Sequence, residues 1–397
     1  MENLKNNPDV KEPKDTYNIA YIIHFLLGAG NLLPWNALIT AIDYFGHRYP
    51  DKHVEKVFSV AYMSSSLLVL IVMISWSNFS KIFTFQVRMK IGFTMFVVSL
   101  MVTPTIDWAW EGLQNEKTLN ATFNTVVASV VMCGLADGLI GGSLVGSAGK
   151  LPKQYMQAVF AGTGSSGIMV SLLRIITKAS VPNNPQGLKK SAHLYFLVST
   201  FILLVCMVFC HLLYKLPVME QHYKSFQHTT SNSTTKLWEV ARTIQWPAIG
   251  ILIIYTVTLS IFPGFLAENI ESQILKDWYP IILITIYNFS DFLGKSFTAV
   301  FVLSSISKAT WGCIGRLVLY PLFTACLHGP KWLRNEVFVI FLTVVLGFTN
   351  GYLTSVIMIM APKLVSTSES EMAAIVMALF LGLGLVFGSV LGWFWII

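Results

Sequence analysis

Long apolar runs divide this chain of 397 residues into segments that are each long enough to cross a lipid bilayer. A helix of about 20 apolar residues spans the hydrocarbon core of a membrane. Windows of that length predict eleven spanning helices, joined mostly by short polar turns. The predicted spans are 18–44, 57–76, 82–107, 123–148, 157–178, 193–214, 246–266, 278–303, 309–327, 336–360 and 372–396.

The composition agrees with a membrane protein and excludes an ordinary soluble enzyme. Hydrophobic residues make up 54% of the chain and charged residues 12%, whereas soluble domains carry about 25% charged residues. We therefore expect an all-α polytopic membrane fold. Its parts are a cytosolic tail (1–17), a six-helix half (18–214), a cytosolic loop (215–245) and a five-helix half (246–397).

Residues 1–17 are polar and no cleavable signal peptide is visible, so the first apolar run is expected to be a spanning helix. The orientation is predicted from the cations, with the N-terminus placed in the cytosol. In that orientation slightly more of the 27 Lys and Arg residues face the cytosol. We expect a multi-pass protein of the plasma membrane, with the vacuolar membrane as the alternative.

Several function classes lack support in the sequence. The cations are scattered over many loops, so no nucleic-acid partner is expected. The five cysteines and eight histidines have no metal-ligand spacing and form no catalytic motif. Gly162, Gly164 and Gly167 match a dinucleotide fingerprint, but they lie inside an apolar helix with no preceding strand. We expect no metal, no cofactor and no enzyme activity, and we expect a monomer.

Glycines recur every fourth residue in two predicted spans, at 134–146 and at 384–392. Small residues at this spacing let helix backbones approach closely. Plain packing is the simpler interpretation, and sliding between helices during transport is compatible with it.

The span 278–303 contains Asn288, Asp291 and Lys295, which share one helix face. Charged groups in the membrane interior are costly and therefore indicate a functional site. An amide, a carboxylate and an ammonium could together hold neighbouring hydroxyl groups, as on a sugar. The alternative is an ion pair that bridges helices and binds no ligand.

Three more charged residues, Asp137, Arg174 and Arg316, lie inside predicted spans. Asp137 could pair with either arginine as a lock or gate. It could instead take up and release a proton.

The first span contains Leu32, Pro34, Trp35 and Asn36. Proline removes a helical hydrogen bond and predicts a kink there. Because Trp35 lies in the middle of the span, it could form an aromatic wall for a flat polar ring, with the Asn36 amide beside it. Ordinary core packing is the equal alternative.

These motifs resemble the equilibrative nucleoside transporter family over essentially the whole chain, and residues 150–162 resemble its plant members in particular. The motifs are Leu32-Leu-Pro-Trp-Asn36, Asp291-Phe-Leu-Gly-Lys295 with the residues to Phe301, Thr349-Asn-Gly-Tyr-Leu353 and Leu381-Gly-Leu-Gly-Leu385.

The resemblance implies a fold related to the major facilitator superfamily, with a central site between the six-helix and five-helix halves. It implies that Leu32 and Trp35 flank the nucleobase, while Ile39 and Leu385 complete an apolar pocket. Asn288, Asp291 and Lys295 would serve the ribose.

Two positions depart from the family pattern. Lys295 stands where the family often has Arg, so a single point charge replaces a bidentate group. Gly141 stands where animal members have a Gln that contacts the base. Asp137, one turn earlier, could supply the missing polarity and suggests proton coupling.

The sequence therefore predicts a transporter of adenosine and other purine and pyrimidine nucleosides by alternating access, either equilibrative or proton-coupled. The alternatives are an ion-conducting channel and a carrier of another small polar metabolite, such as a nucleobase. A membrane-embedded enzyme is a further rival.

Overall fold

A computed structural model describes residues 15–392 except 51, 77–81, 110–115, 183, 220–236, 263–264, 267–269, 271, 273 and 331–332. Every regular element of two or more turns among these residues is a helix, which confirms the predicted all-α class. The first half contains α1 (Ile19–Thr40), α2 (Ile42–Arg48), α3 (Val54–Ser75), α5 (Phe85–Ala109), α6 (Glu116–Lys150), α7 (Lys153–Ser180) and α8 (Pro185–Leu213).

The second half begins with α10 (Leu237–Ile261) and α12 (Tyr279–Phe297). The next two helices, α13 (Ile306–Gly315) and α14 (Leu319–His328), are joined by a 3-10 turn, and together they correspond to one predicted span. They are followed by α15 (Glu336–Met360), a 3-10 turn (Ala361–Leu364) and α16 (Ser370–Leu391).

Within the described ranges, 10 helical segments are long and apolar enough to cross a membrane. The predicted span 278–303 is not among them, although its core forms α12, a helix of 19 residues. Its polar side chains, including Asp291 and Lys295, lower its hydropathy. The total of eleven spans remains a prediction.

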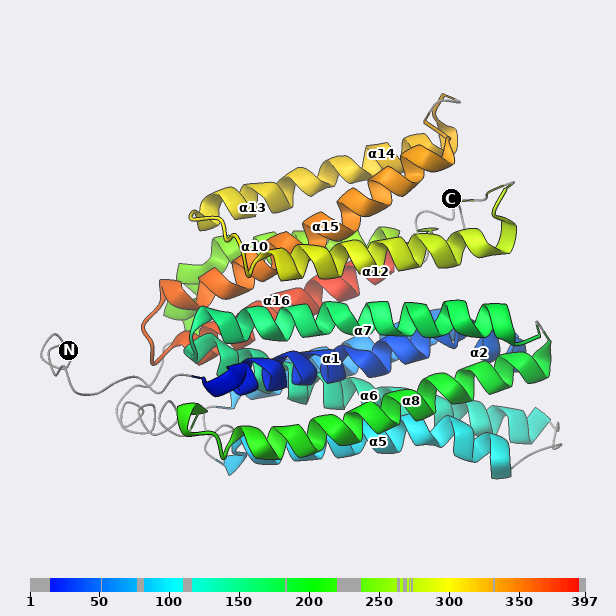
Figure 1. The fold of residues 1–397 in the computed structure, drawn as a ribbon, viewed down its shortest axis with the longest axis horizontal. Coiled ribbons are helices and arrows are strands. Elements are labelled where there is room, and N and C mark those ends of the chain that lie inside the picture. Colours follow the sequence, from blue (N-terminus) through cyan, green and yellow to red (C-terminus); the bar gives the residue numbers. More distant parts are fainter. Residues whose placement is uncertain are drawn as a thin grey trace, which may run out of the picture.

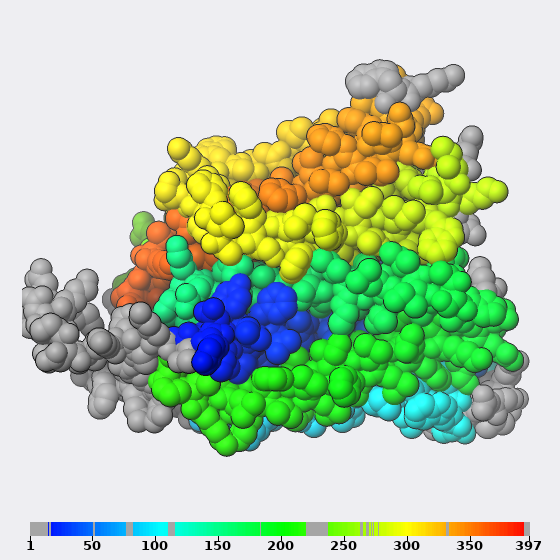
Figure 2. Space-filling model, in the orientation of Figure 1, coloured from blue at the N-terminus to red at the C-terminus, as the bar shows by residue number. Residues whose placement is uncertain are grey.

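The helices form two side-by-side groups whose axes run roughly in one direction (Figure 1). One group contains α1, α5, α6, α7 and α8, and the other contains α10, α12, α13, α14 and α15. The surface in Figure 2 follows the same division, with α12 lying against α7 where the groups meet. Helix α12 of the second half therefore lies at the contact with the first half.

Two helix boundaries differ from the predicted ones. The first predicted span is interrupted at Ala41, where α1 gives way to α2. Helix α10 begins at Leu237, inside the predicted loop 215–245, and its first turns expose Trp238 and Glu239. Hydropathy finds only the membrane-embedded part of a helix, whereas backbone hydrogen bonding can extend past it into the polar region.

Both glycine repeats lie at close helix contacts. A Cβ atom on Gly138 of α6 would lie 2.4 Å from the Ser66 carbonyl of α3, and one on Gly384 of α16 would lie 2.6 Å from the Leu252 carbonyl of α10. No larger residue fits at these distances unless the helices separate. The predicted packing role is confirmed, and sliding between helices stays a prediction.

Candidate substrate site

Helix α12 lies between α15 of its own half and α7 of the other half, and glycines allow close contact on both sides. On the α15 side, a Cβ on Gly351 would lie 2.0 Å from the Asp291 carbonyl. On the α7 side, a Cβ on Gly164 would lie 2.9 Å from the Phe292 Cα, and one on Gly167 would lie 3.0 Å from the Asn288 side chain. The polar face of α12 is therefore held against two helix backbones.

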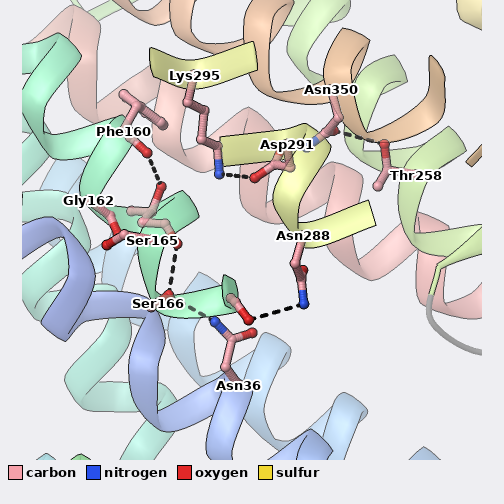
Figure 3. A network of polar contacts seen from close by, with 12 residues as sticks. Asn36, Phe160, Gly162, Ser165, Ser166, Thr258, Asn288, Asp291, Lys295 and Asn350 are labelled. Atoms are coloured by element: carbon pink, nitrogen blue, oxygen red, sulfur yellow. Dashed lines mark hydrogen bonds and ion pairs between the residues drawn. The ribbon is translucent and has the colours of Figure 1, made fainter. Parts of the chain in front are cut away.

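Asp291 and Lys295 form an ion pair in the interior. Lys295 Nζ lies 2.7 Å from Asp291 Oδ2, and the two residues are only 4% and 6% exposed. Asn350 of α15 donates its amide to the other carboxylate oxygen, Oδ1, over 2.7 Å (Figure 3). The Asp291 carboxylate is thus held by one cation and one amide, as buried charge requires.

Arg316, in the turn between α13 and α14, extends this polar network. Its Nη1 lies 3.3 Å from Asn350 Oδ1, and its Nη2 donates to Thr258 Oγ1 over 2.8 Å. It also donates to two main-chain carbonyls, those of Ile254 and Leu346. Thr258 in turn donates to Asn350 Oδ1 over 2.8 Å. With its oxygen bound by Arg316 and Thr258, Asn350 presents its amide NH2 to Asp291.

Two predicted substrate residues are bound to α7 from opposite sides. Asn288 of α12 donates to Ser171 Oγ over 2.8 Å, and Asn36 of α1 donates to Ser166 Oγ over 2.9 Å (Figure 3). Helix α7 therefore connects the α1 motif to the α12 motif. Each asparagine keeps its carbonyl oxygen as an acceptor.

Trp35 packs on Tyr62 of α3, with 4.7 Å between ring centroids. One helical turn along α3, Ser66 donates to Asp137 Oδ2 of α6 over 2.8 Å. The indole and the partly buried Asp137 carboxylate therefore meet the same face of α3. Three other predicted pocket residues are partly buried and pack against the main core: Leu32, Ile39 and Leu385.

The predicted pairing of Asp137 with an arginine is wrong for this structure. Arg174 forms its ion pair with Asp43 of α2, and Arg316 has the neutral partners described above. Spacing along the sequence cannot tell which helices pack together, so it offered no way to choose between partners.

A cluster of charges that the sequence analysis missed joins the two halves. Glu371, at the start of α16, pairs with Lys150, at the end of α6, and lies 3.7 Å from Arg88 of α5. None of the three was predicted to be a site residue, although Arg88 is only 4% exposed. Asn350 was also missed as a site residue, although it lies in the quoted motif 349–353.

The described residues contain no group of three or more His, Cys, Asp or Glu side chains that could hold a metal ion. The cysteines among them are all buried and free.

Comparisons with known proteins agree with the family that these motifs resemble. A family model described as nucleoside transporter matches residues 127–237 and 222–397. Equilibrative nucleotide transporter 8 of Arabidopsis thaliana is 63% identical over 98% of this chain and 98% of its own length. Equilibrative nucleotide transporter 1 of the same plant is 46% identical over 98% of this chain and 88% of its own.

Solved structures share the fold at low sequence identity. A proton:xylose symporter of the major facilitator superfamily has a TM-score of 0.65 at 12% identity and covers 96% of this chain and 89% of its own. A bacterial homologue of the iron transporter ferroportin, in an outward-facing state, has a TM-score of 0.63 at 13% identity, covering 94% of this chain and 92% of its own. The predicted relation to the major facilitator fold is confirmed.

Proposed function

The chain belongs to the nucleoside transporter family, and on that premise we propose that it carries nucleosides, adenosine among them, through a site between its two halves. It is a multi-pass integral membrane transporter.

The observation that supports the ribose site is the buried ion pair of α12. An ionised carboxylate offers about four acceptor positions, and Lys295 and Asn350 occupy one on each oxygen of Asp291. The remaining positions can accept hydrogen bonds from ribose hydroxyls. Lys295 keeps further donors for a hydroxyl oxygen, and Asn288 adds a carbonyl one turn along the same face.

The base would lie against α1. Trp35 offers a flat apolar surface, and Leu32, Ile39 and Leu385 would enclose the ring. A polar solute crosses lipid slowly because it must shed its water hydrogen bonds. Matched groups on α12 and α1 replace those bonds inside the protein and lower the barrier.

Alternating access requires the two halves to separate at one end while they close at the other. The ion pairs of Glu371 with Lys150 and Arg88 hold the halves together at the α6–α7 turn. We infer that this cluster acts as the gate at that end and breaks when the site opens there. Arg174 with Asp43 would lock α7 to α2 within the first half.

Asp137 is the candidate for proton coupling. It accepts a hydrogen bond from the Ser66 hydroxyl, and within the described residues no cation forms an ion pair with it. A proton can therefore bind Asp137 without leaving a buried cation unpaired. Without such binding, transport would simply follow the nucleoside gradient.

We further infer a carrier without a catalytic step, active as a monomer in the plasma membrane with its N-terminus in the cytosol. The two Arabidopsis relatives are named as nucleotide transporters. Two buried cations, Lys295 and Arg316, lie near a single carboxylate, Asp291, in the second half, so a phosphorylated substrate is the second candidate.

Labelled adenosine uptake, in cells that lack their own nucleoside carriers, tests the proposal. Uptake should be saturable and should be reduced by other nucleosides more than by adenine, uracil or AMP. Stronger competition by AMP would favour a nucleotide carrier, and competition by free bases alone would favour a nucleobase carrier. Nucleoside-independent current would indicate a channel.

A second arm of the same experiment tests coupling. Uptake measured at external pH 5.5 and 7.5, with and without a protonophore, separates a proton-coupled carrier from an equilibrative one. Uptake that responds to neither change would exclude proton coupling.

A further inference from the structure

Asn31 of α1 lies over the glycine of α6 that departs from the family pattern. A Cβ atom on Gly141 would lie 3.3 Å from Asn31 Nδ2 and 3.6 Å from Asn31 Oδ1. The carboxamide thus fills the space that a side chain at position 141 would occupy. The missing side chain of one helix is replaced by an amide from another.

The oxygen of this carboxamide has no partner. Asn31 Oδ1 is buried and accepts no hydrogen bond from the part of the chain that the structure describes. Buried acceptors are nearly always satisfied, and an exception calls for an explanation such as a ligand. The other two asparagines near α7, Asn36 and Asn288, already donate to serine hydroxyls.

The position of Asn31 relative to Trp35 suggests what the ligand group is. The two residues are four apart on α1, so they lie on one face, one turn apart. On α6, Gly141 is likewise one turn from Asp137. The orphaned oxygen therefore lies one turn from the indole against which the base would stack.

We propose that Asn31 recognises the amino-bearing edge of the nucleobase and gives the transporter a preference for aminated bases, adenine and cytosine. Oδ1 accepts a hydrogen bond from the exocyclic amine, and Nδ2 donates to the adjacent ring nitrogen. In nucleic-acid recognition an asparagine makes a comparable two-point contact with adenine N6 and N7. Here the ring nitrogen is N1 of adenine or N3 of cytosine. The inference rests on the proposed function, because it places the base beside Trp35.

A keto group in place of the amine would set an acceptor against an acceptor. Hypoxanthine and uracil carry such a group, and their adjacent ring nitrogen carries a hydrogen that faces the Nδ2 donor. A site built to bind a hydrogen-bonding group discriminates against an analogue that lacks it. For one two-point contact we expect a preference of about tenfold to hundredfold.

Two matched substrate pairs test the inference: adenosine against inosine, and cytidine against uridine. In each pair the amine is exchanged for a keto group, so the ratio of inhibition constants cancels differences in expression. The wild-type protein should favour adenosine over inosine, and cytidine over uridine, by about tenfold or more. Equal inhibition within both pairs would overturn the inference even if every substituted protein failed to fold.

Asn31→Leu keeps the volume and removes the polar atoms. The preference for adenosine over inosine should fall to near onefold, and the amount of the variant at the cell surface is measured as the control. The double variant Asn31→Ala/Gly141→Gln returns a carboxamide from α6 and should restore part of the preference that Asn31→Ala loses. An unchanged ratio in Asn31→Leu would overturn the role of Asn31.

Uptake and selectivity distinguish a failure of the proposed function from a failure of the Asn31 inference. If the wild-type protein takes up none of the four nucleosides, the proposed function is wrong and the inference falls with it. If uptake is normal but the ratios do not depend on position 31, only the inference is wrong.

Discussion

Each half of the molecule has a carboxylate inside its helix bundle, the buried Asp291 in the second half and the partly buried Asp137 in the first, and the two are satisfied in different ways. In the second half, Asp291 is bound by the Lys295 ammonium and by the Asn350 amide, which Arg316 and Thr258 hold in turn. In the first half, Asp137 is bound by the Ser66 hydroxyl. One carboxylate belongs to a charged network, and the other has a neutral partner.

This difference separates two tasks. Protonation of Asp291 would leave Lys295 buried without its counter-charge, which is strongly unfavourable. Protonation of Asp137 removes a partly buried charge and leaves no cation unpaired. The second half is therefore suited to fixed, permanent binding groups, and the first half to a group whose charge changes during the transport cycle.

The variant with the largest expected effect removes both charges of the Asp291–Lys295 ion pair, so neither charge is left without its partner. In the double variant Asp291→Asn/Lys295→Gln, both charges disappear together, so the fold should survive because replacing both partners of a buried pair is often close to neutral. Two hydrogen bonds to charged groups are lost, and adenosine uptake should fall about 100-fold or more. Uptake is measured per molecule at the cell surface.

A single variant, Asp291→Ala, serves as the control for that test. Asp291→Ala leaves Lys295 unpaired and should abolish uptake, with reduced thermal stability in detergent. Normal uptake by Asp291→Ala or by the double variant would exclude the ribose role and leave the ion pair as a purely structural bridge.

The next test places a methyl group in the contact between α12 and α15, which should force the two helices apart. A Cβ on Gly351 would lie 2.0 Å from the Asp291 carbonyl, so Gly351→Ala should destabilise the protein by about 3 kcal/mol or more. The melting temperature of the purified protein reports the change. Gly315→Ala is the matched control, because a Cβ there meets nothing within 4 Å, and it should leave the melting temperature unchanged or raise it slightly. Equal melting temperatures for the two variants would contradict the close contact.

Arg316→Lys should have a smaller effect that is confined to the charged network. Lysine keeps the charge but cannot bind Thr258, Asn350 and two carbonyls at once, because it lacks the planar fork of donors. Losing about one charge-assisted hydrogen bond should weaken adenosine binding about tenfold. We expect a higher KM for uptake with little change in surface expression. An unchanged KM would mean that Asn350 positions Asp291 without help from Arg316.

Asp137→Asn should have the smallest effect at neutral pH and the clearest effect on pH dependence. The amide is nearly isosteric and stays neutral, so uptake at pH 7.5 should change by only about twofold to fivefold, the loss of one ordinary hydrogen bond. If Asp137 binds the coupled proton, wild-type uptake rises as the external pH falls, and the variant shows a flat profile. A variant that keeps the wild-type pH profile would place coupling elsewhere.

The fold was largely predictable because a membrane makes hydropathy unusually informative. The interior of a bilayer excludes unsatisfied backbone groups, so long apolar runs have to be helices. The span 336–360 coincides with α15, and the quoted motifs lead directly to the family. Helix α12 was predicted as part of the span 278–303, but its charged and amide side chains lower its mean hydropathy below that of the other spans.

The contacts within the site were less predictable. Asn288, Asp291 and Lys295 share one helix, so spacing alone placed them on one face. Partners on other helices depend on which faces meet, and spacing along the chain carries no such information. This is why Arg174 was considered for Asp137 when its partner is Asp43, and why the ion pairs of Glu371 were not predicted.

The two glycine contacts of α12 have a mechanical consequence. On the α15 side the backbones touch, so α12 moves with its own half. On the α7 side, Gly164 and Gly167 carry no side chains that would interlock with α12. One half can therefore rotate against the other along the line of this contact. Atoms close to a rotation axis move least. If the halves rock about this line, the Asp291 group stays nearly still while the Glu371 gate opens, and a bound solute changes sides with hardly any travel of its own.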